Sequence, residues 1–265
     1  MPPPSENLPG ASAPATVEPG ERPGTWVVRL DGMDQSCMDL GDPTRLDFDY
    51  VRRIGGLLDA AAAPGEPLRV LHVGGAGMTL ARYVAATRPG SRQVVLEPDV
   101  ALVDLVRERM PLPRRSGISV RPQDGRAGLA GVHDGWAQAV VVDAFAGAQV
   151  PPELVTLEAW QQVARVRAPG GLVVLNLSDR APFAWARRVV AGAQAGLGEA
   201  GGVETGAKRI AVGLEVATLR GRRAGNLLLV CPAAPLPAAG DPAYRWLDSE
   251  AVSSSLGGGA PLRDP

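Results

Sequence analysis

The chain carries a glycine-rich loop and, further along, a carboxylate at the spacing that nucleotide-binding proteins use. The loop, Gly74–Gly77, directly follows the apolar run Leu68–Val73. Glycine lets the backbone approach a ligand closely, and the free N–H groups at the start of a following helix can bind it. Glu97 stands about 20 residues after the loop, where a carboxylate can accept hydrogen bonds from both ribose hydroxyls. Together these residues predict a site for a ligand that contains a nucleoside.

The same loop argues against a nicotinamide dinucleotide as that ligand. The dinucleotide fingerprint G-x-G-x-x-[GA] requires a third small residue, because the helix packs closely against the strand there. Leu80 occupies that position. The pattern is therefore compatible with an S-adenosyl compound, and a strand–helix turn without any ligand is the structural alternative.

Two further carboxylates follow predicted strands. Asp124-Gly125 comes after the run Ile118–Arg121, and Asp143 ends the run Ala139–Val142. The carboxyl ends of parallel strands open into a crevice, so we expect these side chains to meet a ligand. Asp124 can accept a hydrogen bond from an adenine amino group, and Asp143 can act as a general base or a cation site. The structural alternatives are an exposed turn residue for Asp124 and a helix cap for Asp143.

A parallel sheet must position these residues, and the hydrophobic pattern predicts one. Strands are expected at 26–30, 68–73, 93–96, 118–121, 139–142, 172–177, 210–219 and 226–231, with helices between most of them. Continuous apolar strands separated by helices indicate a parallel sheet covered on both faces. The last two strands flank Arg220–Arg223, which predicts a hairpin turn and an antiparallel edge. We therefore predict an α/β, Rossmann-like fold of the class I S-adenosylmethionine-dependent methyltransferase type, with a C-terminal antiparallel hairpin and a short N-terminal β segment.

The two ends of the chain differ in composition from its middle. Residues 1–24 are rich in Pro, Ser, Glu and Gly and are expected to form a disordered tail. Residues 25–64 are expected to form the short β segment and a helix, and residues 65–235 the nucleoside-binding domain. Residues 236–265 are expected to be a loosely ordered tail.

Composition argues against several other classes of protein. A net charge of −1 and 4% aromatic residues leave no basic field or stacking platform for nucleic acid. No apolar run approaches the ~20 residues that span a bilayer, and the first residues lack a signal peptide's features. We therefore expect a cytoplasmic protein without a membrane partner. Cys37 and Cys231 are far apart, no residues have metal-binding spacing, and His72 is expected to be packed inside its strand.

In order and spacing, several stretches resemble the spermidine synthase family. They are LDGMDQ (30–35), DFDY (47–50), VGGAGMTLARYV (73–84), VVLEPD (94–99), QDGR (123–126) and VVVDAFA (140–146). The resemblance covers residues 25–235. That family moves an aminopropyl group from decarboxylated S-adenosylmethionine to putrescine and releases methylthioadenosine. The resemblance implies a small-molecule amine as substrate, decarboxylated or intact S-adenosylmethionine as co-substrate, and a homodimer.

The resemblance also implies a role for each candidate residue. The positions that hold the nucleoside correspond to Gly74, Gly75, Gly77, Glu97, Asp124 and Gly125. Gln35 contacts the tail of the co-substrate, Tyr50 contacts the amine and Asp143 is the general base. The physical chemistry agrees, because an amine with a pKa near 10 arrives as an ammonium. A carboxylate can attract that cation and accept its proton.

The resemblance is weaker at the positions that hold polyamines. Gly77 and Ala146 stand where the family has aspartates, and Val51 stands where it has a glutamine. A dicationic substrate would lose charge-assisted hydrogen bonds worth about 1.5–3 kcal/mol each. Three hypotheses therefore remain open. They are an aminopropyltransferase-like enzyme with a degenerate polyamine site, an S-adenosylmethionine-dependent methyltransferase, and a non-catalytic nucleoside-binding protein of the same fold.

Overall fold

The computed structural model describes residues 15–147, 149–199, 210–237 and 240–265. The strands are β1 (Ala15–Pro19), β2 (Thr25–Leu30), β3 (Met33–Asp39), β4 (Arg69–Val73), β5 (Arg92–Leu96), β6 (Ile118–Arg121), β7 (Ala137–Val142), β8 (Arg167–Asp179), β9 (Ala211–Glu215), β10 (Gly225–Cys231) and β11 (Tyr244–Leu247). The helices are α1 (Asp49–Ala60), α2 (Thr79–Thr87), α3 (Val100–Arg109), α4 (Gly125–Ala130), α5 (Leu157–Val166), α6 (Ala184–Glu199), α7 (Val216–Leu219) and α8 (Ser249–Leu256), with a 3-10 turn η1 (Pro152–Leu154).

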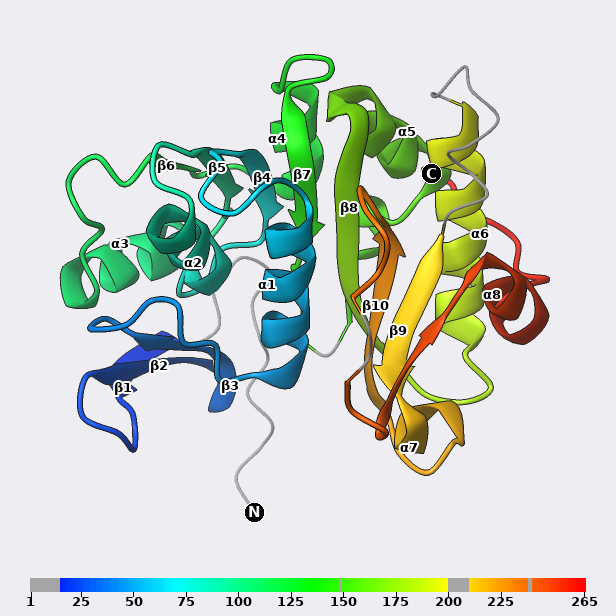
Figure 1. Ribbon diagram of the computed structural model, residues 1–265, viewed down its shortest axis with the longest axis horizontal. Coiled ribbons are helices and arrows are strands. Elements are labelled where there is room, and N and C mark those ends of the chain that lie inside the picture. The colour runs from blue at the N-terminus through cyan, green and yellow to red at the C-terminus, as the bar shows by residue number, and fades with distance from the viewer. Residues whose placement is uncertain (1–14, 148, 200–209, 238–239) are drawn as a thin grey trace, which may run out of the picture.

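A mainly parallel sheet of eight strands forms the centre of the molecule, in the order β11-β9-β10-β8-β7-β4-β5-β6 (Figure 1). The five strands from β8 to β6 run parallel, whereas β10 is antiparallel to both β8 and β9. The predicted class of fold is therefore confirmed. The predicted strand 210–219 is too long, because the pairing of β9 with β10 ends at Leu214–Leu227. Residues 216–219 have no strand partner there and form α7.

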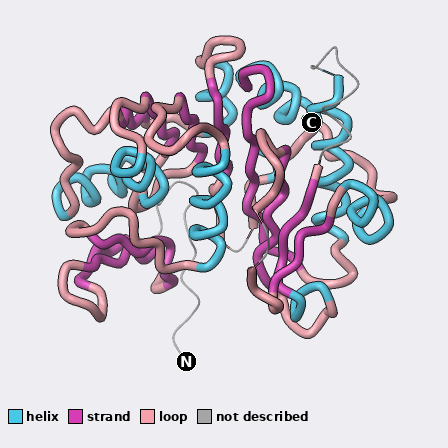
Figure 2. The backbone as a smooth tube through the Cα atoms, viewed as in Figure 1, coloured by secondary structure: helices cyan, strands magenta, loops and turns pink. Residues whose placement is uncertain are grey.

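Each central strand contributes to two hydrophobic cores. In β7, Val140 and Val142 face the core beneath α4, α5 and α6, while Ala139 and Val141 face the core beneath α1 and α2. Figure 2 shows helices on both sides of the sheet. Because both faces are covered, these strands appear in the sequence as continuous apolar runs rather than as alternating ones.

The small sheet β1-β2-β3 packs against α2 and α3 through a third core. The disordered tail expected up to residue 24 is therefore too long, because residues 15–19 form β1. Val17 is buried in the third core, and β1 pairs along its whole length with β2, from Ala15–Leu30 to Pro19–Trp26. Local composition does not reveal this strand, since its stability comes from a partner strand and a distant core. Residues 1–14 lie outside the described part.

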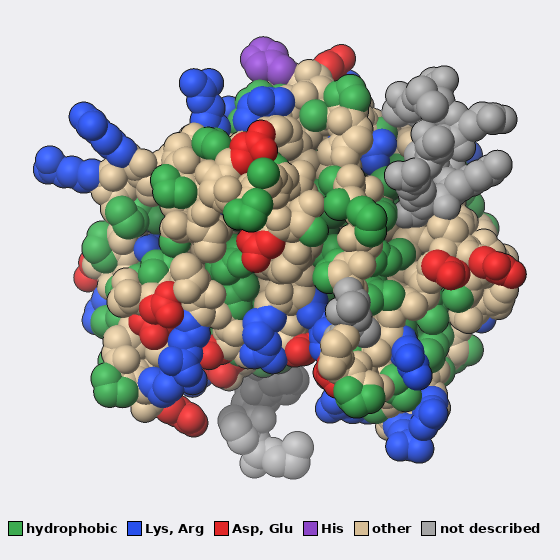
Figure 3. All heavy atoms as spheres, in the orientation of Figure 1, with side chains coloured by type: hydrophobic (Ala, Val, Ile, Leu, Met, Phe, Trp, Pro, Cys, Tyr) green, Lys and Arg blue, Asp and Glu red, His purple; other side chains and the backbone are tan. Residues whose placement is uncertain are grey.

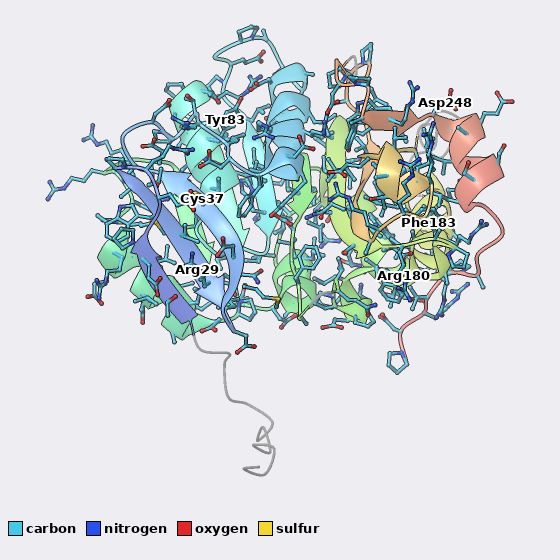
Figure 4. All side chains as sticks on the ribbon, turned by 90° about the horizontal axis from the view of Figure 1, so that it is seen from below. Arg29, Cys37, Tyr83, Arg180, Phe183 and Asp248 are labelled. Carbon is cyan, nitrogen blue, oxygen red and sulfur yellow. The ribbon has the colours of Figure 1, made fainter. Side chains whose placement is uncertain are left out.

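The expected loose tail at 236–265 also contains regular structure. β11 pairs with β9, and α8 follows it with Asp248 as its N-cap, labelled in Figure 4. Asp248 Oδ1 accepts a hydrogen bond of 2.9 Å from the N–H of Ala251. Val252 and Leu256 then bury their side chains in the core beneath α6. The segment is mostly polar, so its composition does not predict a helix. The burial of two apolar side chains is enough to stabilise this short one.

The surface carries charges of both signs, and Figure 3 shows basic and acidic side chains interspersed on one face. Several form exposed ion pairs, such as Arg29 with Glu18 at 2.7 Å and with Asp34 at 2.6 Å on the small sheet. Such exposed pairs contribute little to stability. Within the described ranges, no helix is both long enough and apolar enough to cross a membrane.

Candidate active site

A pocket of about 360 Å³ lies at the carboxyl ends of the central strands. It is enclosed by the loop after β4, the ends of β5 and β7, the start of α1, strand β3, residues 144–146, and Pro151, Glu153 and Leu154. Every site residue predicted from the sequence lines this one pocket: Gln35, Tyr50, Gly74, Gly75, Gly77, Glu97, Asp124, Gly125 and Asp143. Parallel strands bring the glycine loop, Glu97, Asp124 and Asp143 to one edge of the sheet. Strand β3 adds Gln35, and α1 adds Tyr50.

The glycine loop lets β4 end close to its neighbouring strands. Gly74 has a φ of +94°, and a Cβ there would lie 2.3 Å from the carbonyl oxygen of Asp143. A Cβ on Gly75 would lie 2.7 Å from Val95 Cγ1. Glycine is required at both positions, for a left-handed backbone in the first and for close approach in both.

Glu97 joins the end of β5 to this loop. Its Oε2 accepts a hydrogen bond of 2.9 Å from the N–H of Gly75, and its Oε1 accepts one of 3.1 Å from the N–H of Asp99. Burial raises the pKa of Glu97, and these backbone donors oppose the rise. A carboxylate oxygen has more than one lone pair. Glu97 can therefore hold the loop and still accept hydrogen bonds from a ligand.

Asp124 lies exposed at the rim of the pocket and caps α4. Its Oδ1 accepts a hydrogen bond of 2.9 Å from the N–H of Ala127. No residue in the described ranges bonds its Oδ2. The next residue, Gly125, is buried, and a Cβ there would lie 2.4 Å from Val73 Cγ1. Asp124 thus has a structural role in the helix and one oxygen left for a ligand.

Asp143 lies where β7 ends, between a strand and a helix that both donate to it. Asn176 Nδ2 donates a hydrogen bond of 2.9 Å to Asp143 Oδ1, and the Tyr50 hydroxyl also donates to this carboxylate. Burial raises the pKa of Asp143, and the two donors oppose the rise. Burial and the nearby Asp143 charge raise the pKa of Tyr50, so its phenol keeps the proton it donates. Asp143 caps no helix, because the next helical element begins after Pro151.

Strand β3 forms the wall beside the glycine loop. Gln35 and Ser36 lie on it, and Ser36 Oγ is 2.6 Å from Thr79 Oγ1 at the start of α2. A Cβ on Gly77 would lie 2.4 Å from Ser36 Oγ. An acidic side chain at position 77 therefore has no room unless Ser36 moves, and a pair of neutral hydroxyls occupies this corner instead.

The charged residues that line the pocket are all acidic: Asp47, Glu97, Asp99, Asp124, Asp143 and Glu153. Within the described ranges, no Lys or Arg lines it. Asp47 is neutralised by Arg22 at 2.6 Å and Arg45 at 3.7 Å. Arg82 donates to the carbonyl of Gly77 and also to the backbone carbonyls of Met110 and Pro111, behind the loop. A pocket with this balance of charge attracts cations.

The histidines and cysteines contribute no metal site among the residues that the structure describes. His72 is packed in β4 as expected, with its Nε2 2.9 Å from Gln93 Oε1, and burial lowers its pKa to about 4. Cys37, labelled in Figure 4, lies on the pocket wall, and its thiol donates to Asp47 at 3.1 Å. Burial raises the pKa of this thiol to about 11, which keeps it protonated and unreactive.

Sequence reasoning missed Asn176, the donor to Asp143. The residue sits within the run Leu172–Leu177, which predicts a buried apolar strand. Its own type was the available signal, because a lone amide in a buried strand must find a hydrogen-bond partner. The apolar wall formed by Phe48 and Phe145 was missed as well. No sequence signal marks it.

Comparisons with known proteins agree with this geometry. No protein-family model matches the chain. A polyamine aminopropyltransferase of Chromobacterium violaceum is 27% identical over 142 residues, which cover 54% of this chain and 53% of that relative. The match thus spans about half the length of the curated relative.

Two solved structures place the fold. A probable spermidine synthase from Corynebacterium glutamicum superposes with a TM-score of 0.82 at 27% identity, covering 95% of this chain and 93% of that one. Human methyltransferase-like protein 13, in complex with SAH, superposes with a TM-score of 0.54 at 21% identity, covering 79% and 93%. The strand order and these neighbours define a class I methyltransferase-like α/β protein. Within that class, the chain is similar to a polyamine aminopropyltransferase over about half its length and to a probable spermidine synthase over most of it.

Proposed function

We propose that this protein is an aminopropyltransferase-like enzyme that transfers the aminopropyl group of decarboxylated S-adenosylmethionine to an amine. The observation that carries the proposal is the pocket itself, which has a hydrogen-bonded Asp143 at its base and carboxylates as its charged lining. Donor and acceptor in this reaction are both cations. The likeness to aminopropyltransferases over half the chain supports the same reaction.

Asp143 is the proposed general base. The acceptor enters as an ammonium, and the Asp143 carboxylate attracts it and takes one proton. The freed nitrogen lone pair attacks the carbon beside the sulfonium, the C–S bond breaks, and its electrons neutralise the sulfur. The products are methylthioadenosine and the elongated amine. Tyr50 and Asn176 assist by donating to the carboxylate, which favours its ionised form.

The nucleoside half of the donor is assigned to the pocket residues on β3 and those that follow β4, β5 and β6. We infer that Gly74, Gly75 and Gly77 form the close backbone surface, and that Glu97 accepts from the ribose hydroxyls. Asp124 Oδ2 would accept from the adenine amino group, and Gln35 would contact the tail. These roles follow from the family resemblance and from the free acceptor capacity described above.

A methyltransferase is the second candidate, and the corner near Gly77 favours it. Ser36 and Thr79 place hydroxyls where the family resemblance implies an aspartate for an ammonium. Hydroxyls and the N-terminus of α2 can receive the carboxylate of intact S-adenosylmethionine. The two candidates therefore differ in the donor they accept.

A product assay by mass spectrometry separates the candidates. The purified protein receives decarboxylated or intact S-adenosylmethionine, each with and without a panel of amines. Methylthioadenosine that forms only when an amine is present supports aminopropyl transfer. S-adenosylhomocysteine instead assigns the protein to the methyltransferases. If the nucleosides bind but neither product forms, the protein is a non-catalytic nucleoside-binding member of this fold.

A further inference from the structure

Asn176 is a buried amide in a strand that is otherwise apolar. It has no exposed surface, and its neighbours Leu175 and Leu177 lie in the core beneath α6. A buried amide without partners would cost free energy, and here both ends of the amide are bonded. Its Nδ2 donates to Asp143 Oδ1 at 2.9 Å, and its Oδ1 accepts from Asn226 Nδ2 at 3.0 Å.

The register of the sheet places these three side chains in a row. Val142 of β7 pairs with Leu175 of β8, so the next residues, Asp143 and Asn176, lie opposite each other. Asn226 of β10 lies two residues from Leu228, the partner of Asn176, and so it points to the same face. That face is covered by α1, which supplies Tyr50. Asp143 is thus bonded from the sheet on one side and from a helix on the other.

The row has a direction. An amide presents a donor at one end and an acceptor at the other. Because Asn226 donates to Asn176, the oxygen of Asn176 must face β10 and its nitrogen must face Asp143. The reversed amide would place an oxygen against the Asp143 carboxylate and a nitrogen against the Asn226 nitrogen, which is unfavourable at both ends. The Asp143 carboxylate can only accept, so it orients the Asn176 amide, and the Asn226 donor reinforces that orientation.

We propose that Asn176 and Asn226 are positioning residues that hold Asp143 ionised and oriented for its role as base. The proposal deepens the proposed function and rests on it. Asn176 acts by direct donation. Asn226 acts indirectly, by keeping the nitrogen of the Asn176 amide turned towards Asp143. Neither residue contacts the substrate in this role.

The pKa of Asp143 is the quantity to measure, and the titratable groups around it can be told apart from it. Tyr50 of α1 donates to it and has a raised pKa. Glu97 and Asp124 line the pocket from other strand ends, and His72 on β4 has its pKa lowered to about 4. NMR of protein labelled in the aspartate carboxyl carbons can follow Asp143, assigned by its absence in Asp143→Asn.

The test compares Asn176→Leu and Asn226→Asp with Ser178→Ala as a matched control. Ser178 lies on β8 two residues from Asn176, so its side chain is on the same face of the sheet, and it pairs with Asn226. Asn176→Leu deletes the donor. Asn226→Asp can only accept, so it competes with Asp143 for the amide nitrogen of Asn176. We expect both to raise the pKa of Asp143 and Ser178→Ala to leave it unchanged.

Activity gives a second, separate measurement. In both asparagine variants we expect kcat at neutral pH to fall about tenfold or more, and the acid limb of the kcat/KM profile to move to higher pH. Nucleoside affinity should stay at the wild-type value. An unchanged Asp143 pKa in folded Asn176→Leu overturns the inference. A wild-type protein that transfers nothing overturns the proposed function instead, and the NMR titration still decides whether the asparagines control Asp143.

Discussion

At the scale of single residues, Asp143 combines burial with two hydrogen-bond donors. If it is the general base, Asp143→Asn removes the proton acceptor while it keeps the size of the side chain. We expect transfer to fall by about a hundredfold or more and nucleoside binding to persist. Product formation and calorimetry with methylthioadenosine measure the two effects. Turnover at the wild-type rate would remove Asp143 from the mechanism.

Asp143→Asn is expected to increase the stability of the fold, although it removes the proposed base. Burial raises the pKa of Asp143 in the folded protein above its unfolded value. The stability that this group contributes is then present below the unfolded pKa and is lost as the pH rises through the folded pKa. We expect Asp143→Asn to melt at a higher temperature than wild type at neutral pH, and the difference to shrink in acid. Thermal melts across that range would contradict this expectation if the difference grew in acid.

Glu97 provides the residue-scale test of the nucleoside site. Glu97→Ala deletes the acceptor proposed for the ribose hydroxyls and also releases Gly75. We expect the Kd for methylthioadenosine to rise about ten- to a hundredfold, as measured by calorimetry. Glu108→Ala on α3 is the control, because Glu108 is exposed and lies outside the pocket. Equal affinity in both variants would mean that the ribose binds elsewhere.

At the scale of elements, the contact between β3 and the glycine loop decides what position 77 can hold. Gly77→Ala puts a Cβ 2.4 Å from Ser36 Oγ. We expect this to destabilise the protein by about 1–3 kcal/mol, and Ser36→Gly to remove part of the cost. Denaturant unfolding of the two single variants and the double variant measures the coupling.

Gly56→Ala is the matched control for this cycle. Gly56 lies in α1, and a Cβ there meets nothing within 4 Å. The substitution is expected to stabilise the helix by about 0.5–1 kcal/mol. If Gly77→Ala and Ser36→Gly have simply additive effects, β3 does not restrict this corner of the pocket.

At the scale of the whole molecule, the C-terminal segment connects helices that are far apart in the sequence. Leu157 N–H donates to the carbonyl of Leu262 at 2.8 Å, and Arg126 of α4 forms an ion pair with Asp264. Arg187 of α6 donates to the carbonyl of Gly257 at 2.6 Å. The segment thereby braces α4 and the start of α5, which contact η1, and Glu153 and Leu154 of η1 line the pocket.

Deleting residues 257–265 tests this bracing. We expect the free energy of unfolding to drop by about 2–3 kcal/mol. Hydrogen bonds are lost, and the apolar surface that Leu262 covers becomes exposed to water. Hydrogen exchange should increase in α4 and at the start of α5. If hydrogen exchange is unchanged in both helices, the C-terminal segment does not stabilise them.

Particular residues show how far sequence reasoning reached. Gly74, Glu97 and Asp143 were found because each follows an apolar run, and the ends of parallel strands meet at one edge. The order of the central elements followed from the same runs, because a sheet buried on both faces leaves continuous apolar stretches. These features depend on local pattern and on rules that hold for every parallel sheet.

Other features depend on contacts between segments that no local pattern links. β1 forms because β2 and a distant core accept it, and α8 forms because Val252 and Leu256 reach the core under α6. The role of Asn176 depends on the strand register, which places it between Asp143 and Asn226. The sequence alone determined the class of fold and the residues at the strand ends. The tertiary structure decided their partners, because hydrogen-bond direction and close packing are set by which segments meet.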